Sequence, residues 1–450
     1  MMNTWSTPFE WFGQTESFRP ASHLAVLNFA WGAQEFTATQ VMAGTGLTRA
    51  TVIDVLGILV DAGLLTELAN ARVAGTQGVG AEAAAAGAAA SAAAGGAAGG
   101  AAGVEGLAAA SAYRKGRPAR RFAFRPEAGV VVGIDAGYTH LTAIAADLAG
   151  NTLAAVHTLT GYAPDTEDEP NEDEAQWRRG ALRSLVSEVV QAAGRSEAEL
   201  FAVCVGVPAP VTEAGNSPRH HSGFWQRVNP GLLEALGDVA PVVRVENDAL
   251  LAAVAEGSVG AARGCRSYVT VLGGARMGAG VVIDGQLLRG VHGAVGEMNA
   301  FEHVRGVGDS RGLADFAASL GAKMVASGQA AAGGAFAGLE PCEVTGRLVF
   351  EAIEAQDPDA LRIAEKVGQR LARIVTVIES FYDPELIVVS GAVGPAMLKV
   401  IEHARAAMPD TFDSIVPELV GSELGAESVV TGAVAAAVQM ARANALDIVD

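Results

Sequence analysis

Near the amino terminus, apolar residues recur at helical spacing in three short segments separated by polar or glycine-rich turns. The first segment spans residues 23–32, and the other two begin after Thr37 and Thr48, the last extending to about residue 62. Each threonine stands where a side-chain oxygen can cap the first turn of a helix. The sequence Gly-Thr-Gly-Leu at residues 44–47 separates the second segment from the third. This arrangement predicts a helix-turn-helix.

Two short strands are predicted after these helices, with a long insertion between them. Residues 63–67 break the helical period, and residues 119–124 alternate between apolar and polar side chains as a hairpin partner does. Residues 75–112 are almost entirely Ala and Gly and offer no apolar face, so we interpret them as a disordered insertion at the tip of a wing. A plain interdomain linker is the alternative, and it would leave the basic strand without a partner.

From residue 129 onward, strand-like and helix-like segments alternate, which predicts an α/β fold. Uninterrupted apolar runs indicate buried strands, and apolar residues spaced by three or four positions indicate helices. The expected strands are 130–135, 141–147, 152–158, 200–207, 242–246, 267–272, 279–283, 286–288 and 386–390. The expected helices are 176–194, 357–382 and 426–444, and the acidic run 165–174 is expected to be a solvated loop.

The charge of the chain is unevenly distributed. The formal net charge is −19, but residues 1–126 hold nine Lys/Arg and eight Asp/Glu, so this part carries +1 and the remainder −20. Residues 113–125 contain six basic residues and no acidic one. An acidic body with one locally basic end is typical of a protein that touches DNA through a single element. A length of 450 residues also exceeds one core and indicates two or three domains.

Cysteine usage and the lack of a signal-like segment point to a cytoplasmic protein without a membrane partner. Cys204, Cys265 and Cys342 lie far apart and fit no CxxC pattern, so we expect them to be small core residues in a reducing compartment. Nothing in the sequence approaches 18 consecutive bulky apolar residues, and no basic segment followed by an apolar core opens the chain.

Several predicted strands end in turns that carry glycine, carboxylate and amide groups. Asp135 and Gly137 follow one buried strand, Asn247 and Asp248 follow another, and Glu297 closes a glycine-rich stretch. Backbone N–H groups in such turns hold phosphates, and carboxylates there bind sugar hydroxyls and accept their protons. On the residues alone, an ordinary hairpin at Asp135 and a helix N-cap at Asp248 remain open as simpler interpretations.

Six such turns, in this order and behind a winged helix, resemble the ROK family of repressors, open reading frames and sugar kinases, within the actin-like (ribonuclease H-like) sugar-kinase fold. The most specific matches are residues 246–249, residues 290–297 and the sequence Lys-Gly-Arg-Pro-Ala at residues 115–119. The domains that the resemblance implies are a winged helix (20–74 and 113–126), the insertion (75–112), a first lobe (127–246 and 426–450) and a second lobe (247–425).

The resemblance also implies roles for individual residues. Asn247 and Asp248 would bind sugar hydroxyls, with Asp248 as the base in the kinases of the family, and Glu297 would contact the sugar. The turns that would face nucleotide phosphates contain Asp135, Gly137, Gly273, Gly274 and Gly278.

The sequence departs from the kinase pattern at each of these turns. Tyr138 follows Gly137 where the kinases carry a second Gly and a Thr, and Arg276 adds bulk where they have a Gly-Thr-Gly turn. Ala300 stands in the position of the histidine that binds sugar and zinc, and residues 302–318 lack the cysteines of the zinc loop, so that His303 alone cannot form a metal site. Since phosphoryl transfer depends on positioning and charge stabilisation, we expect kinase activity to be lost, and no metal or cofactor to be needed.

The predicted DNA contacts lie on the third helix and on the basic strand. Thr48, Arg49 and Thr51 are expected at the start of the recognition helix, where Arg49 would contact either a guanine or a phosphate. Backbone contacts are expected from Arg114, Lys115, Arg117, Arg120 and Arg121. A homodimer, or a dimer of dimers, on a two-fold operator is expected because one small winged helix binds weakly.

The sequence therefore favours a DNA-binding regulator that senses a sugar, a sugar phosphate or a related metabolite. An ATP-dependent sugar kinase of the glucokinase type, with an added DNA-binding domain, is the alternative, and only that reading requires ATP and Mg²⁺. A third possibility is a regulator in which Ala300 and the lost zinc loop have abolished sugar binding.

Overall fold

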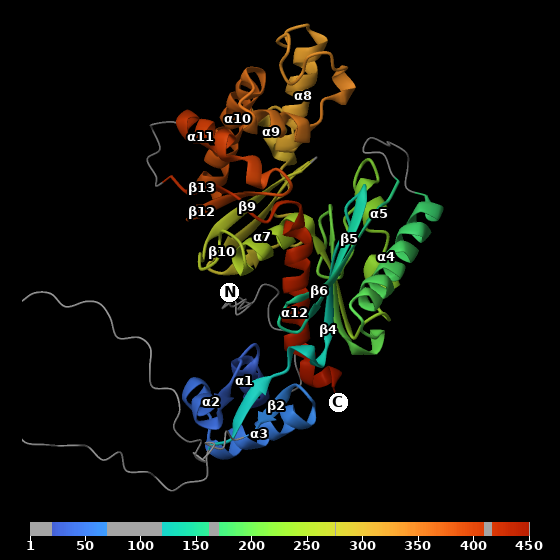
Figure 1. The fold of residues 1–450 in the computed structure, drawn as a ribbon, viewed down its shortest axis with the longest axis vertical. Coiled ribbons are helices and arrows are strands. Elements are labelled where there is room, and N and C mark those ends of the chain that lie inside the picture. The colour runs from blue at the N-terminus through green and yellow to red at the C-terminus, as the bar shows by residue number, and fades with distance from the viewer. Residues whose placement is uncertain (1–19, 70–118, 162–170, 275, 409–415, 450) are drawn as a thin grey trace, which may run out of the picture.

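The computed structural model describes residues 20–69, 119–161, 171–274, 276–408 and 416–449, which form an N-terminal domain and two lobes (Figure 1). The predicted insertion at residues 75–112 lies outside the described residues, as do the predicted DNA contacts Arg114, Lys115 and Arg117. In Figure 1 the N-terminal domain lies at one end of the molecule, below the lobe that contains β4 and β5.

The N-terminal domain consists of three helices and a three-stranded antiparallel sheet whose strand order is β1-β3-β2. Thr37 Oγ1 accepts a hydrogen bond from Gln40 N and Thr48 Oγ1 accepts one from Thr51 N, so both predicted N-caps are confirmed. Helices α2 and α3 are turned by 115° relative to each other, as in a helix-turn-helix. The elements are α1 (Ala21–Ala30), β1 (Phe36–Thr37), α2 (Ala38–Thr45), α3 (Arg49–Asp61), β2 (Leu65–Leu68) and β3 (Arg121–Phe124).

Two glycines shape the end of α2 and the turn into α3. Gly46 has a φ of 71°, a left-handed conformation that glycine adopts without steric cost. Gly44 faces Phe29 of α1, and a Cβ at this position would lie 2.6 Å from Cε2 of that ring. The turn that the sequence predicted at residues 44–47 therefore requires glycine both for its own conformation and for the packing of α1.

The first lobe is built on a five-stranded sheet in the order β6-β5-β4-β7-β8. Strands β4, β7 and β8 are parallel, while β5 and β6 return antiparallel from β4. The long helix α4 covers the outer face of this sheet (Figure 1). The elements are β4 (Val130–Asp135), β5 (His140–Asp147), β6 (Thr152–Leu159), α4 (Glu172–Ala192), β7 (Leu200–Val207), α5 (Phe224–Val228), α6 (Leu232–Leu236) and β8 (Val242–Asn247).

The second lobe repeats the same sheet plan, in the order β11-β10-β9-β12-β13, with β9, β12 and β13 parallel. Its elements are α7 (Asp248–Ser258), β9 (Tyr268–Gly273), β10 (Met277–Ile283), β11 (Gln286–Leu288), α8 (Leu313–Ala326), α9 (Gly346–Glu354), α10 (Pro358–Tyr382), β12 (Leu386–Ser390), α11 (Leu398–Ala407) and β13 (Glu418–Gly421). Short 3₁₀ turns lie at η1 (Pro126–Ala128), η2 (Glu197–Glu199), η3 (Asn299–His303), η4 (Pro341–Glu343), η5 (Gly394–Ala396) and η6 (Gly425–Glu427).

Two helices connect the lobes. The C-terminal helix α12 (Ser428–Ile448) packs on the sheet of the first lobe, α7 packs on the sheet of the second, and the two helices pack against each other. Glycine permits this close approach, since a Cβ at Gly432 would lie 1.9 Å from the carbonyl oxygen of Leu251. Among the described residues, the helical stretch Gly425–Ile448 is the one continuous helix long and apolar enough to cross a membrane, but 72% of its most apolar window is buried inside the fold.

The structure corrects two expectations from the sequence. Residues 172–174 of the acidic run are the first turn of α4, capped by Asn171, whose Oδ1 accepts a hydrogen bond from Glu174 N; acidic side chains are favourable there because the helix N-terminus carries partial positive charge. The expectation that all three cysteines are core residues is also wrong, because Cys204 is buried while Cys342 is exposed.

Candidate functional site

Three carboxyl groups that the sequence singled out come together between the lobes. Asp135 ends β4, Asp248 begins α7, and Glu297 is held against β10 by a backbone bridge to Gly278. Burial, and the negative charges of Asp135 and Glu297, raise the pKa of Asp248 from its ordinary value of 3.8 to about 8. We call these three residues the interlobe carboxyls.

The protonation state of Asp248 is set by its crowded surroundings. Its Oδ1 accepts a hydrogen bond from Ala249 N at 2.8 Å. With a pKa of about 8, the carboxyl is mainly protonated at neutral pH and can donate a hydrogen bond to a bound hydroxyl. Burial also raises the pKa of Glu297, against the opposing effect of Arg276. Asp248 is therefore adapted to exchange a proton with a ligand near neutral pH.

Asn247 serves the fold directly. Its Oδ1 accepts a hydrogen bond from Leu250 N at 3.1 Å, and its Nδ2 donates to Ala209 O at 3.1 Å. The residue that caps α7 is therefore Asn247, and the simpler interpretation of Asp248 as an N-cap is wrong. Asn247 is 7% exposed, and its amide fixes the end of β8 beside Asp248.

A buried ion-pair cluster that the sequence analysis missed lies next to this turn. Glu246 is fully buried and pairs with Arg289, which follows β11 in the second lobe. Nε of Arg244 lies 3.5 Å from Oε2 of Glu246, and the Glu246 Oε1 atom accepts a hydrogen bond from Asn247 N. Burial and the charge of Arg244 lower the pKa of Arg289 to about 10. The cluster ties the second lobe to the end of β8, and two charged residues in an otherwise apolar strand, Arg244 and Glu246, were its signal in the sequence.

An arginine of α4 binds the backbone of the first predicted phosphate turn, which follows β4. Arg178 of α4 is 1% exposed, and its guanidinium donates to the carbonyl oxygens of Ala136, Gly137 and Val228. A carbonyl that accepts from Arg178 points toward α4, and this orientation fixes the path of the turn.

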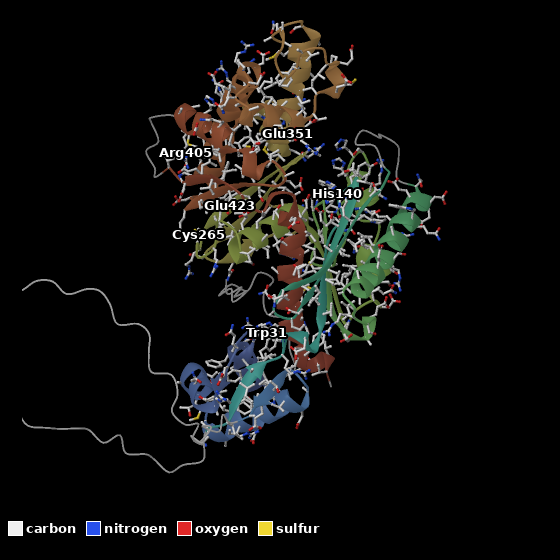
Figure 2. The ribbon with its side chains drawn as sticks, in the orientation of Figure 1. Trp31, His140, Cys265, Glu351, Arg405 and Glu423 are labelled. Atoms are coloured by element: carbon white, nitrogen blue, oxygen red, sulfur yellow. The ribbon has the colours of Figure 1, made fainter. Side chains whose placement is uncertain are left out.

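A histidine side chain occupies the other side of the same turn. His140 lies at the end of the first lobe that faces the second (Figure 2), and its Nε2 is 3.2 Å from Oδ2 of Asp135. A Cβ at Gly137 would lie 2.5 Å from Cε1 of the His140 ring, so the ring lies directly against the turn. The ring of Tyr138, the next residue along the turn, packs edge-on against Phe224 at 5.5 Å.

The second predicted phosphate turn, between β9 and β10, carries a cation. Gly273 ends β9, and a Cβ on Gly274 would meet open space. Gly278 instead lies inside β10, and a Cβ on it would lie 3.1 Å from the Cβ of Ala249. Gly278 therefore serves the packing of β10 on α7. Arg276 donates from Nη2 to Asn299 Oδ1 at 3.1 Å, and its charge acts on Glu297.

An arginine organises the segment in which the resemblance implied a zinc loop. Arg370 of α10 is 1% exposed and donates to the carbonyl oxygens of Val307, Asp309 and Arg311 at 2.7–3.1 Å. Among the described residues, no group of three His, Cys, Asp or Glu side chains could hold a metal ion, and His303 is exposed. The residues present therefore do not fit a zinc ion, and Arg370 holds this segment instead.

The predicted DNA-binding residues differ in their availability. Thr48 and Arg49 are exposed at the start of α3, and Arg49 forms no ion pair with any described residue. Thr51 is used by the helix cap, since its Oγ1 lies 2.9 Å from that of Thr48. Arg120 forms a two-pronged ion pair with Glu67 across the β2–β3 ladder, at 2.6 and 2.7 Å.

Arg121, the other described arginine of this strand, is also paired. Its guanidinium donates to Glu35 and to the carbonyl oxygen of Ala69. Among the described candidates, Arg49 is therefore the cation that an approaching phosphate or base meets without first displacing a carboxylate.

These features define a class of protein: a helix-turn-helix domain joined to a two-lobed, sugar-kinase-like α/β fold with carboxyls at the ends of its strands. Residues 131–440, more than half of the chain, match the model of the ROK family. The chain therefore belongs to the ROK family.

Two solved structures place the fold within that family. A ROK family transcriptional regulator, described as a homolog of the E. coli MLC protein, superimposes with a TM-score of 0.66 at 19% identity, covering 95% of this chain and 98% of that one. A ROK family glucokinase from Streptomyces griseus, in complex with glucose and AMPPNP, gives a TM-score of 0.52 at 19% identity over 69% of this chain and 99% of the other. At these identities the likeness establishes the fold.

Similar curated sequences include a bifunctional enzyme and glucokinases. The bifunctional enzyme NanE/NanK of Brucella suis is 31% identical over 219 residues, which are 46% of this chain and 39% of that protein. The matched region thus spans about two fifths of the length of that relative. A glucokinase of Thermotoga maritima is 24% identical over 286 residues, 56% of this chain and 86% of the glucokinase.

Proposed function

We propose that the protein is a DNA-binding transcriptional regulator whose lobes bind a sugar or a sugar-derived metabolite and whose kinase activity has been lost. The observation that carries the proposal is the start of α3, where Arg49 is exposed and forms no ion pair with a described residue. A helix N-terminus of this kind, on the second helix of a helix-turn-helix, is the part that enters the major groove of DNA.

The DNA contact would be made in two parts. Arg49 would contact a guanine edge or a phosphate, and the exposed backbone and side chain of Thr48 would lie beside the DNA backbone. Because one domain of this size offers a small interface, we expect a homodimer to place two such helices on a two-fold operator.

The effector would bind at the interlobe carboxyls. Asp248, protonated at neutral pH, would donate to one hydroxyl, and Glu297 would accept from another. Arg276 supplies positive charge beside Glu297, which favours a ligand that carries a phosphate or other anionic group there. A ligand that bridges the two lobes would favour one relative arrangement of them, and this is how binding would reach the DNA-binding domain.

The loss of kinase activity is inferred from the first phosphate turn. The His140 ring lies against Gly137 and Asp135, on the surface that would receive a nucleotide phosphate. The residues present thus fit a nucleotide poorly at this turn, and we assign ATP and Mg²⁺ no part in the function.

DNA binding is tested with fluorescence anisotropy on labelled fragments from around the gene, at low salt, where phosphate contacts are strongest. We expect binding by the parent protein and a loss of about tenfold or more in Arg49→Ala. The matched control is Arg347→Ala, which removes an exposed arginine from α9 of the second lobe. The proposal is contradicted if the protein does not raise the anisotropy of the DNA at low salt, or if the two substitutions lower the DNA affinity equally.

A sugar kinase is the second candidate, and the raised pKa of Asp248 favours it because a catalytic base should titrate near the working pH. Incubation with ATP and a panel of hexoses, followed by detection of ADP, decides this question. Turnover that disappears in Asp248→Ala would establish the kinase and remove our preference; no turnover supports the regulator.

A further inference from the structure

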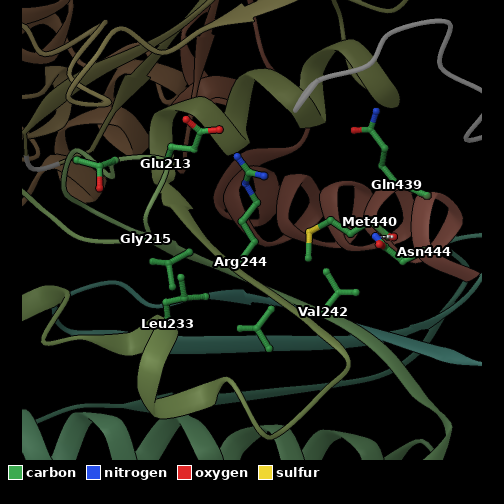
Figure 3. Close-up of a pocket in the computed structure, with 12 residues that line it drawn as sticks. Glu213, Gly215, Leu233, Val242, Arg244, Gln439, Met440 and Asn444 are labelled. Carbon is green, nitrogen blue, oxygen red and sulfur yellow. Dashed lines mark hydrogen bonds between the residues drawn. The ribbon is translucent and has the colours of Figure 1, made fainter. Parts of the chain in front are cut away.

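A cavity that none of the interlobe carboxyls lines lies on the edge strand of the first lobe (Figure 3). It has a volume of about 220 Å³ and is bounded by β8, by the loop that follows β7 and by the C-terminal half of α12. At about 30 Å³ for each water molecule, this volume holds roughly seven waters. The space suits a small metabolite.

The walls of the cavity combine opposite charges with an apolar surface. The guanidinium of Arg244 points toward the carboxylate of Glu213 at one end, and Leu233, Val242 and Met440 lie along the wall (Figure 3). The influence of Glu213 on the pKa of Arg244, which opposes the lowering caused by burial, confirms that the two groups are close.

A cation and an anion side by side, above an apolar wall, match a ligand with the complementary charges. We propose that this cavity binds a free α-amino acid with an apolar side chain, its carboxylate on Arg244, its ammonium group on Glu213 and its side chain against Val242, Leu233 and Met440. A simple carboxylate would face repulsion from Glu213, and a simple amine would face repulsion from Arg244.

The cavity shares a helical turn with the contact that holds the DNA-binding domain. Met440 and Asn444 line the cavity, and between them Arg442 donates from Nε to Asn28 Oδ1 at 2.7 Å and from Nη2 to Asn28 O at 3.3 Å. Asn28 belongs to α1, which packs against α12. An amino acid in the cavity would therefore contact α12, the helix that holds α1 of the winged helix in place. It would act as a second effector. The regulatory part of this inference rests on the proposed function.

Isothermal titration calorimetry on the full chain tests the site. L-leucine is the probe, and 4-methylpentanoate and 3-methylbutan-1-amine are analogues that each lack one of its charges. We expect leucine to bind and each analogue to bind at least about tenfold more weakly, because a charge-assisted hydrogen bond is lost. Failure of leucine to bind, or equal binding of the three compounds, overturns the proposal.

Two variants locate the binding. Glu213 is exposed, so Glu213→Gln should fold normally while weakening leucine binding about tenfold or more. Glu188→Gln, at an exposed position of α4, is the matched control and should bind leucine as the parent does. Unchanged affinity in Glu213→Gln places leucine elsewhere and overturns the assignment of this cavity.

The coupling to the DNA-binding domain is measured by amide hydrogen exchange in α1, a readout that needs neither DNA nor sugar. Saturating leucine should change exchange in α1 of the parent protein, and Asn28→Ala should bind leucine normally but lose that change. No change in the parent protein overturns the coupling. Since DNA is absent from this assay, failure of the regulator proposal and failure of this inference give different results.

Discussion

His140 and Asp135 form a pair across the first strand-end turn, with Nε2 of the histidine 3.2 Å from Oδ2 of the aspartate. The hydrogen bond to Asp135 raises the pKa of His140 above its ordinary value of 6.5, against the opposing effect of burial. In mildly acid solution His140 is therefore protonated, and its positive charge pairs with Asp135 in the turn that resembles a nucleotide-binding element.

Replacing His140 with Gln should make the chain less stable in acid and have little effect in alkali. A histidine whose pKa is raised by folding stabilises the folded chain below the unfolded pKa of about 6.5, and this contribution is lost as the pH rises through the folded pKa. The midpoint temperature of unfolding, measured from pH 5 to pH 9, should thus fall by a few degrees in His140→Gln at pH 5 and converge with that of the parent at pH 9. A difference that is constant with pH would contradict the raised pKa of His140.

Asp248→Asn should stabilise the protein, and more so as the pH rises. Folding raises the pKa of this carboxyl from 3.8 to about 8, so ionised Asp248 opposes folding, and stability declines between these two values. The full shift corresponds to an upper limit of the order of 6 kcal/mol, reached above pH 8.

The test compares midpoint temperatures of Asp248→Asn and the parent protein at pH 4 and pH 9. We expect near equality at pH 4 and a rise of several degrees for the variant at pH 9, while Glu188→Gln, at an exposed position, should follow the parent throughout. A variant less stable than the parent at pH 9 would contradict the raised pKa.

Arg370→Met should loosen the segment between η3 and α8. The substitution leaves the carbonyl oxygens of Val307, Asp309 and Arg311 without their shared donor, at a cost of about 3 kcal/mol or more. We expect a lower midpoint temperature and faster amide exchange at residues 304–311. Lys366→Met, at an exposed position of the same helix, is the matched control.

Zinc provides a second arm of the same experiment. Because no described group of side chains could hold the ion, added zinc should neither stabilise the parent protein nor rescue Arg370→Met. Stabilisation of the parent by stoichiometric zinc would show that another ligand set exists.

Local chemistry made much of the fold predictable from the sequence. The caps at Thr37 and Thr48, the glycine turn between them and the uninterrupted apolar run of β4 are set by neighbouring residues, and each was predicted close to its observed place. Strand β1 was missed because two residues carry no period; it exists because β3 pairs with it.

The candidate site was predictable only in part, because its geometry depends on contacts between distant segments. The sequence singled out Asp135, Asp248 and Glu297, yet the raised pKa of Asp248 comes from burial and from charges on other elements. Arg178 and Arg370 bind backbone carbonyl oxygens that lie 41 or more residues away in the sequence. A pattern of side chains cannot predict such backbone partners. A buried arginine in an amphipathic helix is the one signal that could have found them.

Glu67→Gln should strengthen DNA binding if the winged helix contacts DNA as proposed. Glu67 neutralises Arg120 through two short hydrogen bonds, so the arginine now meets DNA with its charge already paired. Removing the negative charge frees the guanidinium for a phosphate and adds about one unit to the slope of log affinity against log salt concentration. The matched control is Glu351→Gln, which breaks an Arg–Glu pair of the same kind on α9, far from the winged helix. Anisotropy titrations between 50 and 200 mM salt should give a steeper slope for Glu67→Gln and an unchanged slope for the control; parallel slopes for all three proteins would place β3 away from the DNA.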